Sequence, residues 1–118
     1  MKLITAIVRP EKLDELAQAL IGHGVRGLTV TDVRGFGQQY GRLAGTATKV
    51  TGRPGEHMAV LLAKVRLDLV VLDDDAETIV DVIAKHARTE TIGDGKIWVT
   101  PVDSALRVRT GDRDRAAI

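Results

Sequence analysis

The hydrophobic residues of this chain follow alternating strand and helix periods. A β-branched run at residues 3–9, LITAIVR, ends at Pro10 and predicts a strand. The next apolar residues recur at helical spacing and predict a helix: Leu13, Leu16, Ala17, Leu20 and Ile21. Gly22-His23-Gly24 supplies a glycine end to that helix, and residues 28–33, LTVTDV, predict a second strand.

A long segment without a sustained period follows, from Gly35 to about Met58. Stretches of this length in small domains are usually functional. Alternation returns at Val65, Leu67, Leu69 and Val71, which predicts a strand with one buried face. The next apolar stripe predicts a second helix, for which Asp73-Asp74-Asp75 offers capping residues: Ala76, Ile79, Val80, Ile83 and Ala87.

Two short strands complete the pattern, at residues 96–100 (KIWVT) and 106–109 (LRVR). The order strand, helix, strand, loop, strand, helix, strand predicts an α+β fold of the ferredoxin-like βαββαβ type. We expect an antiparallel sheet with both helices on one face, an extra C-terminal strand, and a long loop between the second and third strands. The 118 residues fit one domain, 1–118, with this flexible loop at about 38–62.

Composition narrows the classes of function. Lys and Arg (17) nearly balance Asp and Glu (16), so the net charge of +1 is too weak to predict a nucleic-acid or membrane partner. With only three aromatic residues, a surface of stacked aromatics for single strands is not expected. The absence of cysteine excludes a disulfide framework and a cysteine nucleophile. No apolar run reaches membrane-spanning length, and we expect a cytoplasmic protein without direct membrane insertion.

Three motifs carry candidate chemistry. The glycines of GFGQQ at residues 35–39 let backbone amides approach a phosphate, although glycine also marks ordinary strand ends. GDGK at residues 93–96 is a tight turn with a lysine that is either a phosphate ligand or a surface residue, and it lacks the full Walker spacing. Arg107 and Arg109 share one face of the predicted last strand, where they either clamp a polyphosphate or protect a solvated edge.

Catalytic chemistry has little support in this sequence. The three histidines, His23, His57 and His86, lie in separate elements without metal-ligand spacing. The one serine, Ser104, has no nucleophile-elbow context, and the acidic run at residues 73–75 is more typical of a helix start than of a cation site. We therefore expect no catalytic residues.

Four motifs in order resemble the PII nitrogen-regulatory signal proteins. They are MKLITAIVRP with KLD at residues 1–14, GLTVTDVRGFG at 27–37, IGDGKIWV at 92–99 and LRVRTG at 106–111. Their order and spacing match nearly end to end, apart from the loop between about Tyr40 and Ala63.

The resemblance implies a homotrimer of ferredoxin-like subunits that binds ATP or ADP in clefts between neighbours. The family's phosphate site matches Gly35, Phe36, Gly37, Gln38, Gln39, Gly93, Asp94, Gly95, Lys96, Arg107 and Arg109. Its adenine and ribose pocket matches Ile7, Thr29 and Val70, and Asp68 stands where a glutamate is usual. The resemblance also implies that 2-oxoglutarate joins ATP-bound Mg²⁺ beside Gln39 and Lys64, both of which border the nucleotide.

The departures from the family pattern lie at the phosphate site and in the loop. Gln38 replaces a common phosphate-binding arginine, and Glu90-Thr91 replaces a Gly-Lys pair. The loop is several residues longer than usual. An alignment anchored on Lys64 puts His57 in place of a tyrosine that some members have uridylylated. Arg53, Glu56 and His57 are then the residues expected to contact a partner, without tyrosine modification.

Two other functions stay open at the level of sequence. One is a divergent PII-like regulator that answers to ADP, AMP or bicarbonate in inorganic-carbon control, because the altered loop removes the usual target features. The other is a small nucleotide-processing enzyme, although no catalytic base stands beside the GDGK turn. The principal expectation is a trimeric nucleotide sensor in nitrogen regulation whose loop, the T-loop of the family, docks on a target enzyme, transporter or regulator.

Overall fold

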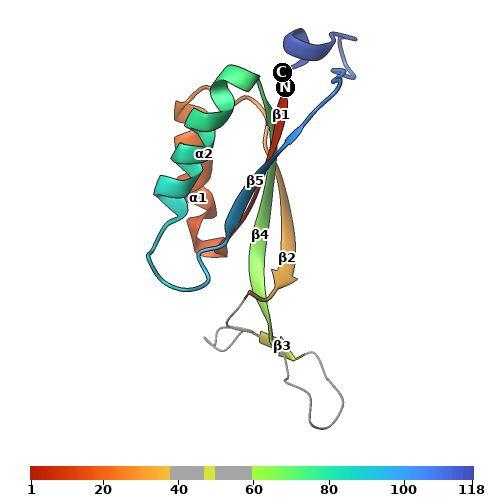
Figure 1. The fold of residues 1–118 in the computed structure, drawn as a ribbon. Coiled ribbons are helices and arrows are strands. Elements are labelled where there is room, and N and C mark those ends of the chain that lie inside the picture. Colours follow the sequence, from red (N-terminus) through yellow and green to blue (C-terminus); the bar gives the residue numbers. More distant parts are fainter. Residues whose placement is uncertain (38–46, 50–59) are drawn as a thin grey trace.

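The computed structural model describes residues 1–37, 47–49 and 60–118, in which two helices cover one face of a sheet (Figure 1). The strands are β1 (Lys2–Val8), β2 (Thr29–Gly35), β3 (Ala47–Lys49), β4 (Val60–Val71) and β5 (Lys96–Pro101). The helices are α1 (Leu13–Gly22) and α2 (Asp73–Ala87), with short 3-10 helices at Pro10–Lys12 and Asp114–Ala117. The antiparallel order β2-β4-β1-β5, with β3 beside β4, confirms the predicted ferredoxin-like arrangement.

The sheet register decides which residues form the core. Side chains alternate between the two faces of a strand, so the residues of β1 and β4 that face the helices are buried: Ile4, Ala6, Val8, Val65, Leu67, Leu69 and Val71. The helices contribute the other half of the core: Leu16, Leu20, Ala76, Ile79, Val82, Ile83 and Ala87. The alternation at 65–71 and the stripe along α2 are therefore confirmed.

Local residues explain where α1 ends and where α2 begins. After α1, Gly24 adopts φ +83°, and the amide of Val25 donates to the Leu20 carbonyl at 3.0 Å, which closes the last turn. α2 begins after Leu72, whose side chain makes no capping hydrogen bond. The three aspartates Asp73, Asp74 and Asp75 lie in the first turn of the helix. Their negative charge there complements the helix dipole.

Two sequence boundaries need correction. β4 begins at Val60, so residues 60–62, assigned to the loop, are strand: Leu62 pairs with Gly35 and Leu61 with Thr48. The extra C-terminal strand at 106–109 is not formed, because the chain reverses at Gly111 (φ +75°) and bonds to itself. The Arg107 amide donates to the Asp112 carbonyl at 2.8 Å, and an isolated bridge joins Leu106 to Arg113.

Candidate functional site

The GDGK motif belongs to a turn, residues 89–95, that joins α2 to β5. This 89–95 turn is closed from inside by the Asp94 carboxylate. The amides of Thr89 and Glu90 donate to Asp94 Oδ2 at 2.7 and 2.9 Å, and the Thr89 hydroxyl donates to Asp94 Oδ1. Glu90 adopts φ 63°, a left-handed conformation uncommon outside glycine. One side chain thus satisfies several backbone and hydroxyl donors of the turn.

Arg9, at the end of β1, attaches the turn to the sheet. Its Nε donates to Asp94 Oδ1 at 3.0 Å, and its Nη2 donates to the Ile92 carbonyl at 2.9 Å. Burial opposes ionisation of Asp94, but hydrogen bonds from Thr89, Arg9 and Glu90 outweigh it and hold the pKa of its carboxyl well below the usual value. Asp94 is therefore ionised, and its carboxylate oxygens accept hydrogen bonds from the turn and from Arg9.

Gly95 makes the closest backbone approach at this end of the sheet. It has φ +105°, and a Cβ built there would lie 1.7 Å from the Ile7 carbonyl oxygen. Glycine is therefore required for both conformation and space. The approach lets Ile7 pair with Lys96 in the β1–β5 register, so the structure brings these two candidate residues together.

Lys64 connects β4 to the same turn. It pairs with Val33 in the β2–β4 register, and its ammonium donates to the Gly93 carbonyl. Burial, together with the neighbouring Arg9 guanidinium, lowers the pKa of the Lys64 ammonium. In this structure the Lys64 ammonium binds a backbone carbonyl of the turn. The same ammonium could bind an anionic ligand instead.

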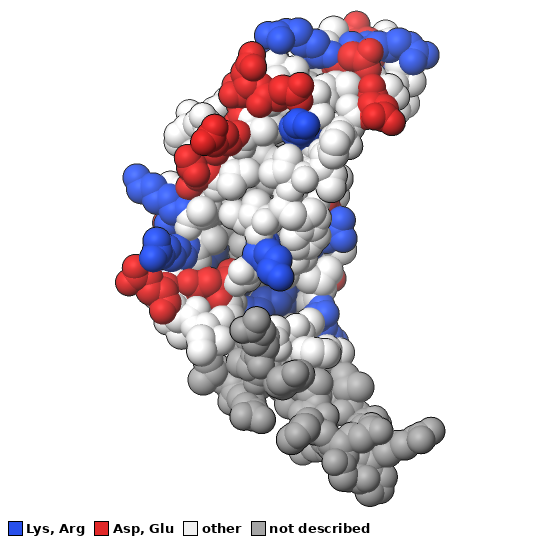
Figure 2. Space-filling view, in the orientation of Figure 1, with Lys and Arg blue, Asp and Glu red and all other residues white. Residues whose placement is uncertain are grey.

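Nine of the expected site residues therefore gather at one end of the sheet, which we call the turn end: Ile7, Gly35, Phe36, Gly37, Lys64, Gly93, Asp94, Gly95 and Lys96. Figure 2 shows Lys and Arg side chains on the visible face near this end, close to the grey residues. Gln38, Gln39, Arg53, Glu56 and His57 lie outside the described residues.

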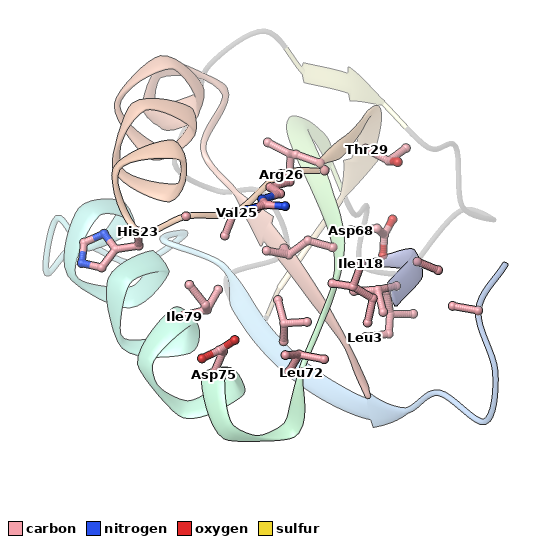
Figure 3. Close-up of a pocket in the computed structure, with 18 of the residues that line it drawn as sticks. Leu3, His23, Val25, Arg26, Thr29, Asp68, Leu72, Asp75, Ile79 and Ile118 are labelled. Atoms are coloured by element: carbon pink, nitrogen blue, oxygen red, sulfur yellow. The ribbon is translucent and has the colours of Figure 1, made fainter. Parts of the chain in front are cut away.

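Three of the remaining candidates line a recess of about 950 Å³ at the other end of the sheet (Figure 3). Thr29, Val70 and Arg107 are in its wall, together with Asp68. Asp68 accepts hydrogen bonds from Arg66 Nε and from the Thr5 hydroxyl, each at 2.8 Å, and these bonds lower its pKa against the opposing effect of burial. The recess combines apolar walls with a few polar groups, as small-molecule sites do.

Sequence reasoning missed other parts of this recess. Arg26, Leu3 and Ile118 also line it and come from three separate segments. Arg26 lies in the connection after α1, where no periodic pattern singles it out. The sequence alone does not show that it faces the recess.

The predicted pairing of Arg107 with Arg109 on one strand face is not observed. Arg107 lines the recess, with its Nη1 3.4 Å from Asp112 Oδ2, whereas Arg109 lies on the following turn and is exposed. Because the segment folds back instead of extending, the two guanidinium groups do not form a period-two clamp within this chain.

The turn end and the recess are separate in one chain. Lys64 and Val70 are six residues apart on β4, about 20 Å in an extended strand. Lys64 and Val70 thus belong to different ends of the strand.

The described part of the chain, residues 1–37, 47–49 and 60–118, contains no group of three or more His, Cys, Asp or Glu side chains that could hold a metal ion. None of its helices has the length and apolar character needed to span a bilayer.

Comparison with known proteins decides the family. The model of the nitrogen regulatory protein P-II family matches residues 1–112. The chain belongs to the P-II family. It is similar to nitrogen regulatory protein GlnK of Escherichia coli K12 (41% identity over 118 residues), and to the P-II proteins of Synechocystis sp. (43%) and Klebsiella oxytoca (47%). Each alignment covers both chains completely.

Membership confirms the resemblance found in the sequence motifs. The relatives are named as regulatory proteins, and none of these names denotes a catalysed reaction. This P-II protein is accordingly a signal-transduction regulator and not an enzyme.

Proposed function

We propose that this P-II protein is a homotrimeric, cytoplasmic sensor of adenine nucleotides that takes part in nitrogen regulation. The observation that carries the proposal is the division of the candidate residues into two groups. The turn end offers Lys96, Lys64 and the glycine backbone to phosphates, and the recess offers Thr29, Val70 and apolar walls to a base and ribose. In the proposed trimer, the turn end of one chain would meet the recess of a neighbour.

The chemistry at the turn end suits a polyphosphate. Lysines bind phosphate as point charges, and the backbone amides around Gly93 and Gly95 can approach an anion where side chains are absent. The carboxylate of Asp94 does not oppose such a ligand, because Arg9 and Thr89 engage it. Mg²⁺ with 2-oxoglutarate would join the nucleotide beside Gln39 and Lys64.

The loop expected at residues 38–62, of which 60–62 belong to β4, is the proposed partner-binding element. It joins the end of β2 to β4 at the turn end, so ligands bound there can act on its base. A ligand selects a loop conformation only through a difference in affinity between conformations. Arg53, Glu56 and His57 would contact the target, and no nucleic acid or membrane insertion is involved.

One departure favours a nucleotide of lower charge. Glu90 adds an exposed carboxylate to the 89–95 turn, paired at 3.1 Å with Arg88. A negative charge near the phosphates disfavours ATP relative to ADP or AMP. A divergent regulator that answers to ADP, AMP or bicarbonate is therefore the second candidate.

Calorimetric titration distinguishes these functions. ATP, ADP and AMP would each be titrated with and without Mg²⁺, 2-oxoglutarate or bicarbonate, and light scattering would give the mass of the assembly. We expect a trimer that binds ATP or ADP, with 2-oxoglutarate coupled to MgATP. Coupling to bicarbonate instead would favour the second candidate, and a monomer that binds no nucleotide would refute both.

The contribution of Lys96 can be tested directly. Lys96→Ala should weaken ADP binding by about 1.5 to 3 kcal/mol, the usual scale for hydrogen bonds that involve charged groups. The matched control is Lys85→Ala, because Lys85 is an exposed lysine in the last turn of α2 and is not among the expected site residues. Equal affinity of both variants for ADP would remove Lys96 from the site.

A further inference from the structure

Arg9 is not among the expected nucleotide-binding residues, yet its side chain makes two long-range contacts at the turn end. Its partners, Asp94 and the Ile92 carbonyl, lie more than 80 residues away along the chain. The side chains of Arg9 and Asp94 are only 23% and 24% exposed. Partial burial strengthens such a charged hydrogen bond compared with an exposed ion pair.

The contacts of Asp94 show that it acts within the turn. Its two carboxylate oxygens accept from Arg9, from the Thr89 amide and hydroxyl and from the Glu90 amide. A carboxylate so engaged has little remaining capacity to bind a ligand itself. Asp94 can nevertheless decide where the backbone of Gly93 and Gly95 lies.

We propose that Arg9 and Asp94 form a positioning clasp that fixes the 89–95 turn against the end of β1 and so arranges the turn to receive nucleotide phosphates. This inference rests on the proposed function, because the ligand it concerns is the phosphate group of ATP or ADP. Neither residue needs to touch the nucleotide. The clasp acts by reducing the ordering that binding would otherwise require.

The other attachments of the turn show why a clasp is needed. Gly95 has no side chain and lies close to the Ile7 carbonyl, and the Lys64 ammonium donates to the Gly93 carbonyl. Lys64 is itself a candidate ligand residue, so it must release Gly93 if its ammonium turns to a bound acid or phosphate. Neither Arg9 nor Asp94 has to release its partner when a ligand binds, so their contact can persist through that exchange.

Affinity measurements on four variants test the clasp. ADP and ATP would be titrated into wild type, Arg9→Gln, Arg9→Lys, Asp94→Asn and the double variant Arg9→Gln/Asp94→Asn. We expect Arg9→Gln and Asp94→Asn each to weaken ADP binding about ten- to a hundredfold, the equivalent of one charged hydrogen bond. The double variant should be no weaker than the worse single variant. Arg9→Lys should bind with intermediate affinity, because lysine keeps the charge but loses the fork that reaches both partners.

Hydrogen exchange without nucleotide provides a readout independent of binding. The amides of Thr89 and Glu90 should exchange faster in Arg9→Gln, because their acceptor is no longer held in place. Val82→Ala is the control for general destabilisation: Val82 is a buried residue of α2 in the helix layer, and its truncation should lower stability without changing ADP affinity.

The outcomes separate this inference from the function on which it rests. If wild type binds ADP and Arg9→Gln binds it equally well, or if the two amides exchange at the wild-type rate, the clasp is refuted while nucleotide sensing stands. Additive losses in the double variant would also refute it, because they would mean that Arg9 and Asp94 act separately. Failure of the wild-type trimer to bind any adenine nucleotide would overturn the proposed function itself.

Discussion

Replacement of Gly95 by alanine is the most severe small change that this structure predicts. The added Cβ would lie 1.7 Å from the Ile7 carbonyl oxygen and 2.8 Å from the carbonyl carbon, whereas ordinary contacts begin near 3.4 Å. Both obstructing atoms are backbone, so no side-chain rotation relieves the clash. The turn must move away from β1, which disturbs the pairing of Ile7 with Lys96 and strains the Arg9–Asp94 contact.

The size of the effect follows from two contributions. Gly95 has φ +105°, and an alanine held in such a conformation costs about 1 to 3 kcal/mol. Separation of the turn from β1 removes at least one backbone hydrogen bond, worth about 0.5 to 1.5 kcal/mol, and weakens the charged bond from Arg9, worth about 1.5 to 3 kcal/mol. We expect a total loss of about 3 to 7 kcal/mol in the free energy of unfolding, a large part of the stability of a small domain.

Two other glycines provide matched controls. Gly111 has φ +75° but no heavy atom within 4 Å of a built Cβ, so Gly111→Ala should lose only the conformational cost of about 1 to 2 kcal/mol. Gly22, the last residue of α1, has neither a positive φ nor a close neighbour, and Gly22→Ala should gain about 0.5 to 1 kcal/mol.

Urea unfolding of the three variants at one fixed protein concentration gives the comparison, because association contributes to apparent stability. The expected order of midpoints is Gly22→Ala, wild type, Gly111→Ala and then Gly95→Ala. A midpoint for Gly95→Ala equal to that of Gly111→Ala would refute the reasoning, since the clash with Ile7 would then have no energetic consequence.

Three further predictions concern single residues. Glu90→Gly should raise the melting temperature by a few degrees, because Glu90 at φ 63° carries a left-handed penalty of about 1 to 2 kcal/mol that glycine lacks; a lower melting temperature would contradict this. Folding lowers the pKa of the Asp94 carboxyl, so this carboxylate stabilises the fold above the unfolded pKa near 4, and the stabilisation is lost as the pH falls below that value. In acid unfolding, the stability difference between wild type and Asp94→Asn should therefore shrink between about pH 5 and pH 2. Leu67→Ala should lower the free energy of unfolding by about 2 to 5 kcal/mol, against less than about 0.5 kcal/mol for Ile21→Ala, since Leu67 is fully buried and Ile21 is 65% exposed.

The hydrophobic period predicted those elements correctly that pack against another element with its own apolar face. The alternation from Val65 to Val71 and the stripe of α2 each identify a face, and the two faces pack on each other. The same reasoning was wrong for residues 106–109, because alternation of Leu106 and Val108 with arginines does not show which strand would pair with them. The reversal at Gly111, with the Thr110 hydroxyl and the Arg107 amide both bonded to Asp112, is a local solution that alternation cannot reveal.

The candidate site was predictable only where a motif is local. GDGK marks the turn because its glycines and lysine are adjacent in sequence, and the register then places Ile7 beside Lys96. The contact between Arg9 and Asp94 joins the end of one strand to a turn 85 residues later and leaves no periodic signal. Likewise, Arg26 enters the recess through the path of the connection after α1.

The division of the site along β4 links ligand binding to assembly. Lys64 belongs to the turn end and Val70 to the recess, and the strand β4 keeps these two residues apart in every subunit. In the proposed trimer, a nucleotide that contacts Lys96 of one chain and Thr29 of another binds only associated chains, so it stabilises the trimer by mass action. By reciprocity, whatever shifts the position of one chain against the next also changes nucleotide affinity. The base of the loop, where β2 meets β4 at Gly35 and Leu62, lies at the turn end of this shared site. The loop is therefore placed to respond both to the ligand and to the contact between chains.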